Sequence, residues 1–419
     1  MRLSSPSTAR LGILVVAGLV ITVGVLAAPT AQAQSFTVLH TFTGQGDGYQ
    51  PYSTLAMDNA GNLYGTTSEV GHGAGTVFQF KRAGSSWILK TLYSFSGPDG
   101  AIPYGGVVFG PDGALYGITA QGGSDNEGTL YRLTPQASLC KSFSCPWNLT
   151  TLHSFVGQGD GRLPYFVAPV FDAAGNLYGT TGLGGANDEG AIFQAVRSGG
   201  TWTESVIHSM DDFTEGAYPP SSVVADQAGN LYGVVENSPN GFGAVFELNA
   251  STGWIWSTLY NFTGNHGGEA PIGSLIVDAA GNLYGTTSSC ASSCGGTVFE
   301  LSPVVNGWTF ATLYSFTGPA NGGPAGPLTM DASGNLYGTA VAAGANGYGS
   351  VFKLTHTQSG WTYTSLHDFD RSDGAGPYGG VFLDSSGNIY GTAAYGGANG
   401  GNCTGPGGVG CGVIFEITP

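Results

Sequence analysis

From residue 36 onward, short apolar runs alternate with Gly-rich polar stretches to the end of the chain. The runs are rich in Val, Ile, Phe, Tyr and Thr, and Gly, Asn, Asp or Pro bounds each of them. This alternation is typical of β-strands separated by turns. No stretch in this region has the 3.6-residue periodicity of an amphipathic helix. The pattern therefore predicts an all-β protein.

One short core, Gly-Asn-Leu-Tyr-Gly or a close variant, is repeated along the chain. The seven copies begin at Gly61, Gly113, Gly175, Gly229, Gly281, Gly334 and Gly387. The copies follow one another at steps of 52, 62, 54, 52, 53 and 53 residues. A regular period of this length indicates a tandem-repeat fold.

Four strand segments recur in each repeat, and we label them a to d. Strand a runs from Pro to Asp, as in 271–278, and strand b is the core itself. Strand c contains Val-Phe, as in 296–301, and strand d begins near a Trp, as at Trp308. The Asp-x-x-Gly-Asn link between a and b is short enough for a tight turn. Four antiparallel strands in each of seven repeats predict a seven-bladed β-propeller.

The two ends of the repeat region complement each other. The last repeat ends after its strand c, at 412–417, whereas a strand of type d occurs first, at 36–42. We therefore expect the N-terminal strand to complete the last blade, which closes the ring and removes an open sheet edge. The predicted domain spans residues 34–419.

The tandem Gly-Asn-Leu-Tyr-Gly-Thr-Thr and Gly-Thr-Val-Phe motifs resemble the GloVer (Gloeo/Verruco) repeat of exported bacterial proteins. The resemblance covers all seven units, essentially residues 36–418. It implies an extracellular or envelope location and no settled biochemical activity. The a–b segments are also similar to those of Asn-His-Leu-type propellers, which supports the fold alone.

Residues 1–33 resemble a secretory signal peptide. Arg2 and Arg10 precede an apolar stretch at 11–28. Ala31-Gln32-Ala33 is a small-x-small cleavage site. A retained membrane anchor is the alternative, because 18 apolar residues are near the minimum for a span. No second apolar span follows. An extracellular or periplasmic, secreted protein is therefore expected.

The charge composition limits the classes of partner that the protein is expected to bind. The chain has 11 Lys and Arg against 27 Asp and Glu, for a formal net charge of −16. Nucleic-acid binding requires basic residues that neutralise phosphates, so this charge argues against it. Only 9% of residues are charged. The hydrophobic fraction of 41% is sufficient for a large core. We expect a monomer.

Acidic and amide side chains recur in the d–a and b–c loops, which share one face of a propeller. The candidate ligand-binding residues there are Asp47, Asp99, Asp160, Asp212, Asp373, Asn187, Asn346 and Asn399. Such a ring of oxygen ligands suits Ca²⁺ or a polyhydroxylated ligand. The simpler interpretation, that Asp-Gly permits the turn geometry, is favoured. No cofactor is expected, with Ca²⁺ as the alternative.

Four tyrosines follow Pro at the start of strand a, near the predicted channel mouth. They are Tyr52, Tyr104, Tyr165 and Tyr378. Exposed rings at this position would stack on sugar rings, and burial beneath the d–a loop is the alternative. The Tyr of each repeat core, by contrast, is expected to pack between blades.

The histidines and cysteines indicate structural roles. His40, His153, His208 and His367 share one position on strand d that Tyr occupies in other repeats, and outer strands of different blades are expected to lie far apart. No metal site is therefore predicted. The cysteines form three local pairs that are typical of loop disulfides in an exported protein: Cys140 with Cys145, Cys290 with Cys294, and Cys403 with Cys411.

No catalytic constellation is visible in the sequence. Both the Gly-x-Ser-x-Gly motif and a phosphate-binding Gly-x-x-x-x-Gly-Lys loop are missing. The favoured function is a non-catalytic binding module for a glycan, a surface component or a protein, through the d–a and b–c loop face. The alternative is a polysaccharide hydrolase or lyase that uses carboxylates of that face.

Overall fold

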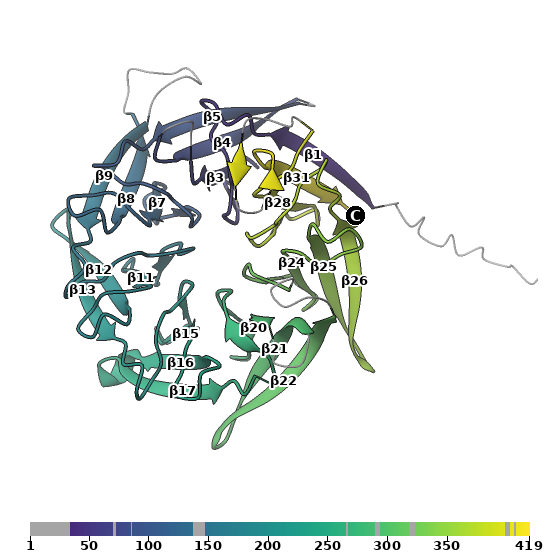
Figure 1. Ribbon diagram of the computed structural model, residues 1–419. Helices are drawn as coiled ribbons and strands as arrows, with labels where there is room; N and C mark the ends of the chain where they lie inside the picture. The colour runs from purple at the N-terminus through teal and green to yellow at the C-terminus, as the bar shows by residue number, and fades with distance from the viewer. Residues whose placement is uncertain are drawn as a thin grey trace, which may run out of the picture. The chain divides into compact units, whose positions relative to one another are not determined.

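The computed structural model describes residues 34–69, 73–84, 86–136, 147–264, 267–289, 294–317, 323–398, 403–405 and 408–419. Seven antiparallel sheets, each containing the four expected strands, form a ring over these residues (Figure 1). The chain is thus an all-β, seven-bladed propeller, as the repeat predicts. The described part contains one 3-10 turn, η1 (Ala250–Thr252), and no helix there is long and apolar enough to cross a membrane.

The strands occupy the same four positions in every blade. Strands a, innermost, are β2 (Ala56–Met57), β6 (Val108–Phe109), β10 (Val170–Phe171), β14 (Val224–Ala225), β19 (Ile276–Val277), β23 (Thr329–Met330) and β27 (Phe382–Leu383). Strands b are β3 (Leu63–Thr67), β7 (Leu115–Thr119), β11 (Leu177–Thr181), β15 (Leu231–Val235), β20 (Leu283–Ser289), β24 (Leu336–Ala340) and β28 (Ile389–Ala393).

The outer half of each blade is longer. Strands c are β4 (Thr76–Ala83), β8 (Thr129–Pro135), β12 (Ala191–Ser198), β16 (Ala244–Asn249), β21 (Cys294–Val304), β25 (Ser350–Thr357) and β31 (Val413–Thr418). Strands d are β5 (Ser86–Ser94), β9 (Trp147–Ser154), β13 (Thr201–Ser209), β17 (Ile255–Asn261), β22 (Gly307–Thr317), β26 (Gly360–Asp368) and β1 (Ser35–Thr41). The remaining short strands are β18 (Glu269–Pro271), β29 (Thr404–Gly405) and β30 (Gly408–Val409).

The first strand closes the ring. β1 pairs antiparallel with β31, in a register that places Phe36 opposite Ile417 and Thr41 opposite Val413. The seventh blade therefore has the order β1-β31-β28-β27 (Figure 1). The offset closure predicted from the two ends of the repeat region is confirmed.

A carboxylate organises the turn between strands a and b. In the first blade, Asp58 accepts hydrogen bonds from the backbone N–H of Ala60 and Asn62, both at 2.9 Å. Its other oxygen accepts from the Asn62 amide at 2.7 Å and from the Tyr64 hydroxyl at 3.0 Å. Burial acts to raise the pKa of Asp58, but these hydrogen bonds outweigh burial and lower it. This network explains why Asp, Asn and Tyr recur together in the core.

The core Tyr lies between blades. The Tyr64 ring meets Phe109, on strand a of the next blade, edge to face at 5.1 Å, and Trp147, on that blade's strand d, at 6.5 Å. Tyr116 repeats this arrangement with Phe171 and Trp202. The predicted inter-blade packing of this Tyr is therefore observed.

The Gly before Val-Phe lets adjacent blades approach closely. At Gly75 φ is +98°, and a Cβ would lie 2.5 Å from Cδ of Pro103 in the next blade and 2.6 Å from the Thr67 carbonyl oxygen. Only glycine avoids both the backbone strain and the overlap. Strand c of the first blade therefore begins where Pro103 of the second blade lies against it.

Candidate functional site

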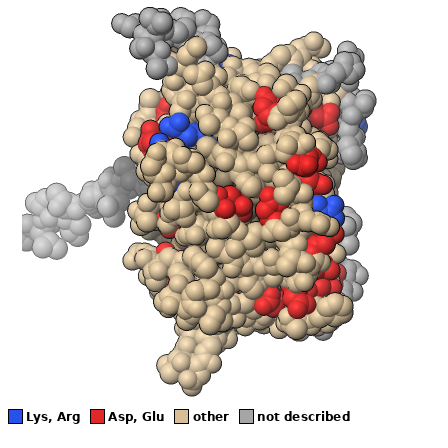
Figure 2. Space-filling view, turned by 90° about the vertical axis from the view of Figure 1, so that its left-hand side faces the viewer, with Lys and Arg blue, Asp and Glu red and all other residues tan. Residues whose placement is uncertain are grey.

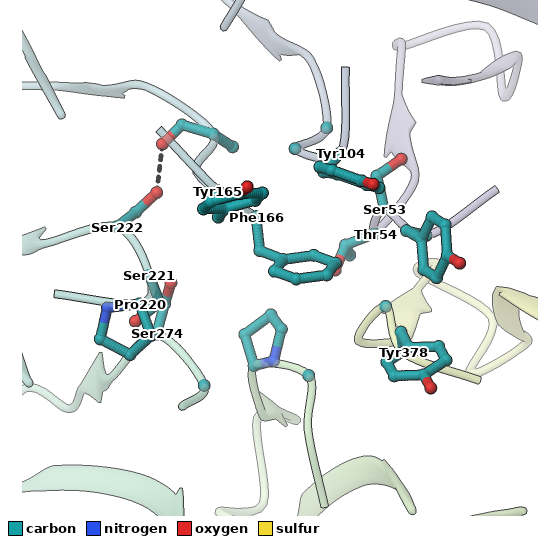
Figure 3. Close-up of a pocket in the computed structure, with 18 of the residues that line it drawn as sticks. Ser53, Thr54, Tyr104, Tyr165, Phe166, Pro220, Ser221, Ser222, Ser274 and Tyr378 are labelled. Carbon is teal, nitrogen blue, oxygen red and sulfur yellow. Dashed lines mark hydrogen bonds between the residues drawn. The ribbon is translucent and has the colours of Figure 1, made fainter. Parts of the chain in front are cut away.

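A central cavity of about 950 Å³ lies at the middle of the ring, where the strands a converge. The segments that line it begin with the Pro-Tyr dipeptides and their counterparts in the other blades. Figure 3 shows Tyr104, Tyr165 and Phe166 together on one side of this cavity and Ser221 and Ser222 on another. A well-formed cavity of this size, lined mainly by apolar and aromatic side chains, is the default candidate site.

Five aromatic rings form a continuous arc on the cavity wall, which we call the aromatic arc: Tyr378, Tyr52, Tyr104, Tyr165 and Phe166. Tyr52 lies 5.2 Å from Tyr378 and 5.3 Å from Tyr104, both edge to face. Tyr104 lies 5.8 Å from Tyr165 and 5.1 Å from Phe166. Tyr165 and Phe166 remain 37% and 45% exposed, so their faces are accessible to a ligand.

The arc contains all four tyrosines that the sequence singles out, together with a ring that the sequence analysis missed. Phe166 replaces the Gly or Ser that follows the Tyr in the other three Pro-Tyr segments. This departure from the repeat is the sequence feature that could have identified Phe166. Tyr395, which also went unnoticed, shares a hydroxyl–hydroxyl hydrogen bond with Tyr52. Burial, followed by this bond, raises the pKa of Tyr52 far above its usual value, so the phenol stays neutral.

An unusual backbone conformation directs each Pro-Tyr segment into the cavity. The residue before the Pro has a positive φ in several blades, for example +55° at Ile102 and +53° at Leu163. The Ile102 N–H donates to the Ala74 carbonyl at 2.8 Å, and Leu163 bonds likewise to Glu127 at 3.2 Å. The b–c loop of one blade thereby holds in place the segment that leads into strand a of the next blade. Such strain requires support from the surroundings, and it clusters at functional sites.

The polar part of the cavity wall is mostly uncharged. The Ser53 hydroxyl accepts from Thr66 at 3.0 Å, and Thr54 accepts from the Gly380 N–H at 2.8 Å. The Ser222 hydroxyl donates to the Ala168 carbonyl, the bond drawn dashed in Figure 3. Ser221 Oγ is buried without a protein partner. Hydroxyl groups of this kind suit a ligand that both donates and accepts hydrogen bonds.

Glu236 is the one carboxylate among the described residues that line the cavity. Glu236 is an exposed residue, yet partial desolvation of its carboxylate raises the pKa of that group. The described lining includes no Lys, Arg, His or Asp. A ligand in this cavity therefore meets aromatic faces and hydroxyl groups rather than a charged surface.

Four of the predicted d–a loop acids lie outside the cavity lining and pair with strand d. Asp47, Asp160 and Asp373 bond to the imidazoles of His40, His153 and His367 at 3.2, 2.8 and 2.8 Å, and Asp99 accepts from the Tyr93 hydroxyl. Each also accepts a backbone N–H of its own loop, as Asp99 does from Ser96 at 2.8 Å. Their hydrogen bonds fit the turn interpretation, and the Tyr or His position on strand d has an acidic partner in these blades.

The remaining loop candidates also make contacts within the chain. Asp212 accepts from the Asn237 amide at 2.7 Å. Asn187 and Asn346 donate to the carbonyls of Met210 and Phe369 at 2.8 and 3.1 Å, which fastens each b–c loop to the end of strand d. Asn399 lies outside the described residues.

The outer strands of adjacent blades come closer than the sequence analysis expects. His153 Nε2, on β9, lies 3.7 Å from Glu204 Oε2, on β13 of the next blade. The expectation that such strands lie far apart is therefore wrong for these two blades, because neighbouring sheets pack face to face up to their outer edge. With Asp160, these residues form the one group of three metal-ligating side chains found among the described residues.

One of the three predicted disulfides falls in the described part of the chain. Cys403 and Cys411 are bonded in the b–c insertion of the last blade, next to the β29–β30 hairpin. The side chains of the pairs Cys140 with Cys145 and Cys290 with Cys294 lie outside the described residues.

Comparisons with known proteins identify the repeat. The Gloeobacter/Verrucomicrobia repeat pattern matches residues 17–145, 138–276 and 236–419. A search of curated proteins finds no match.

The chain also matches several solved structures. A protein described as an oxidoreductase (glucose dehydrogenase) from Thermus thermophilus is 14% identical, with a TM-score of 0.44, over 92% of this chain and 99% of its own. A protein described as a gluconolactonase is 14% identical, with a TM-score of 0.41, over 75% and 87%. A polysaccharide lyase is 10% identical, with a TM-score of 0.49, over 88% and 90%.

Proposed function

Because the chain belongs to the Gloeobacter/Verrucomicrobia repeat family and its seven blades enclose an aromatic cavity, we propose that it is a non-catalytic carbohydrate-binding propeller. The ligand is a neutral glycan, and the aromatic arc of the central cavity is its binding surface.

The observation that carries this proposal is the continuity of the aromatic arc. The contacts between neighbouring rings of the arc have centroid distances of 5.1 to 5.8 Å. Sugar rings have apolar C–H faces that pack on such rings, and the phenol hydroxyls supply a polar edge. Exposed apolar surface inside a cavity is typical of a ligand site.

Charge favours a neutral glycan over an anionic one. The described cavity lining has no basic residue to pair with a carboxylate or sulfate. The net charge of the chain is −16, and the edge-on view in Figure 2 shows many acidic and few basic side chains. Repulsion from this field disfavours polyanions and nucleic acids alike.

Binding is favoured over the hydrolase alternative because glycoside hydrolysis commonly uses two carboxyl groups at a defined separation. Glu236 supplies one carboxyl, with a pKa raised by partial desolvation, which would suit a general acid. A second carboxylate does not accompany it among the described residues of the lining.

An extracellular or periplasmic location completes the proposal. The Cys403–Cys411 disulfide supports it, because such bonds persist in oxidising compartments. The signal-like segment at 1–33 supports it as well.

A glycan array followed by calorimetry tests the function. Cellohexaose, xylohexaose and mannohexaose are the neutral probes, and polygalacturonate is the anionic comparison. Replacing Tyr104 or Phe166 by Ala should weaken binding about tenfold, since a central aromatic contact is worth about 1.4 kcal/mol or more. Phe213→Ala is the matched control, because Phe213 is 89% exposed and is not part of the cavity lining.

Two results would overturn the proposal. One is equal loss of binding in Phe213→Ala and Tyr104→Ala, which would place the glycan outside the cavity. The other is release of shortened oligosaccharide by the wild-type chain, together with loss of that activity in Glu236→Gln, which would establish the enzyme.

A further inference from the structure

One position on the outer strand differs in a single blade. The register between strands c and d places Glu204 opposite Ala195. The residues at the same register position in the other blades are Phe36, Leu89, Leu149, Trp256, Phe310 and Tyr363. All six are apolar or aromatic. The third blade alone therefore has a carboxylate at this position, opposite the smallest of the seven partners.

In other blades this position contacts the His or Tyr of the preceding blade. Phe36 stacks on His367 at 3.5 Å, and Trp256 stacks on His208 at 5.1 Å. Phe310 stacks in the same way on Tyr260 at 4.1 Å. At the equivalent place, Glu204 puts a carboxylate beside the imidazole of His153. An apolar ring contact has thus been exchanged for a polar one at one inter-blade junction.

The Glu204 carboxylate is buried and only partly satisfied. Its side chain is 6% exposed, and Oε2 lies 3.7 Å from His153 Nε2, beyond hydrogen-bond distance. Oε1 has no hydrogen-bond partner. A buried carboxylate without partners is costly, so its presence requires an explanation. A bound cation would provide one.

The other two side chains are held in place. Asp160 Oδ2 lies 2.8 Å from His153 Nε2, while Oδ1 accepts the N–H groups of Val156 and Gly157, both at 3.1 Å. The His153 ring packs edge to face on Phe155 at 5.0 Å. Asp160 and His153 are 15% and 24% exposed, so an ion can reach them from solvent.

We propose that His153, Asp160 and Glu204 form a binding site for a divalent transition metal ion with the ligand preferences of Zn²⁺, on the outer wall between the second and third blades. The imidazole nitrogen and the carboxylate oxygens are ligand types that Zn²⁺ accepts, and three protein ligands leave a fourth position for water. The imidazole nitrogen distinguishes this site from one for Ca²⁺ or Mg²⁺, which favour oxygen ligands alone.

The distances are compatible with such an ion. One donor atom from each residue lies within 4.8 Å of the others. Zinc bonds of about 2.0–2.2 Å separate tetrahedral ligand atoms by roughly 3.4 Å. The His153–Glu204 separation of 3.7 Å is near this value. The His153–Asp160 separation needs to widen from 2.8 Å as the ion replaces their hydrogen bond.

Electrostatic repulsion between Asp160 and Glu204 also favours a bound cation. Two carboxylates close together disfavour the doubly ionised state, and a divalent cation relieves that repulsion.

Calorimetry and metal analysis of the untagged full chain, stripped with a chelator and titrated with Zn²⁺, test the site. We expect one equivalent to bind, and Zn²⁺ to raise the melting temperature. Glu204→Gln should weaken binding about tenfold or more. Glu204→Leu, which restores the residue found in two other blades, should remove the site and yet melt no lower than the metal-free wild type.

Glu215→Gln is the matched control. Glu215 pairs with His208 at 2.7 Å, but Trp256 occupies the third position there. This variant should bind Zn²⁺ like the wild type. The proposal is overturned if the wild type binds no Zn²⁺, if Glu204→Leu binds it undiminished, or if Ca²⁺ competes on equal terms. Glycan binding serves as an independent readout and should not change in Glu204→Leu.

Discussion

The phenyl ring of Phe36 stacks on the imidazole of His367, with centroids 3.5 Å apart and planes inclined by 5°. Phe36 belongs to the first strand of the described chain, whereas His367 lies on the outer strand of the sixth blade. The contact therefore joins the N-terminal strand to the blade that precedes it in the ring. The contact thus adds side-chain packing between blades to the β1–β31 pairing that closes the ring.

Phe36→Ala should destabilise the propeller by about 1–3 kcal/mol. Large-to-small changes in a full core cost more, but Phe36 is only half-buried. Urea unfolding measures the change, and Thr37→Ala, at an exposed position on the same strand, is the control. Equal stability of Phe36→Ala and the wild type would contradict the role assigned to β1.

Gly75→Ala should cost about 2–4 kcal/mol, of which about 1 kcal/mol comes from the positive φ and the rest from overlap with Pro103. Gly84→Ala is the matched comparison, since its φ is +66° but a Cβ would meet nothing within 4 Å. Its cost should stay near 1 kcal/mol. Similar thermal unfolding of both variants would show that the close approach of the blades is unimportant.

The hydrogen bonds of the a–b turn predict that the stability of the protein depends on pH. Burial tends to raise the pKa of Asp278, but hydrogen bonds from Asn282, Ala280 and Tyr284 lower it overall. The folded state thus favours the ionised form, and its stabilisation is fully present above the unfolded pKa of about 3.9. It is lost as the pH falls through the lowered folded-state pKa.

The difference in urea midpoint between the wild type and Asp278→Asn should therefore be largest near neutral pH and shrink in acid. A difference that grows as the pH falls would have the wrong sign. Asp125→Asn, in a loop away from the a–b turns, is the control.

Removing the Cys403–Cys411 disulfide should lower stability by about 2 kcal/mol, because the bond closes a short loop with a sequence separation of 8. The double variant Cys403→Ala/Cys411→Ala, compared with the wild type by calorimetric melting, measures this. Glycan affinity should change little, since neither residue lines the central cavity. A large loss of affinity would show that the insertion supports the site.

The fold can be predicted from the sequence because Asp58, Asn62 and Tyr64 form one hydrogen-bonded unit. This unit recurs in six of the seven blades, and in the second blade Ala114 replaces the Asn. The same regularity makes functional residues difficult to recognise in the sequence. Asp99 and Asp373 look like ligands in a list of loop acids, but their partners on strand d become visible only in three dimensions.

The informative positions are those that break the pattern. Phe166 takes the place of a Gly or Ser, and Glu204 takes the place of an apolar residue. An alignment of the seven repeats with one another could have found both. It could not have shown that Phe166 joins Tyr104, or that Glu204 reaches His153, since both contacts cross between blades.

A crystal structure of the full chain soaked with the neutral hexasaccharide that binds most tightly tests the central claim most directly. The account predicts sugar rings in van der Waals contact, about 4 Å, with the faces of Tyr104 and Phe166 inside the central cavity. Sugar density on the outer strands or the loop face, with the cavity free of it, would contradict the account.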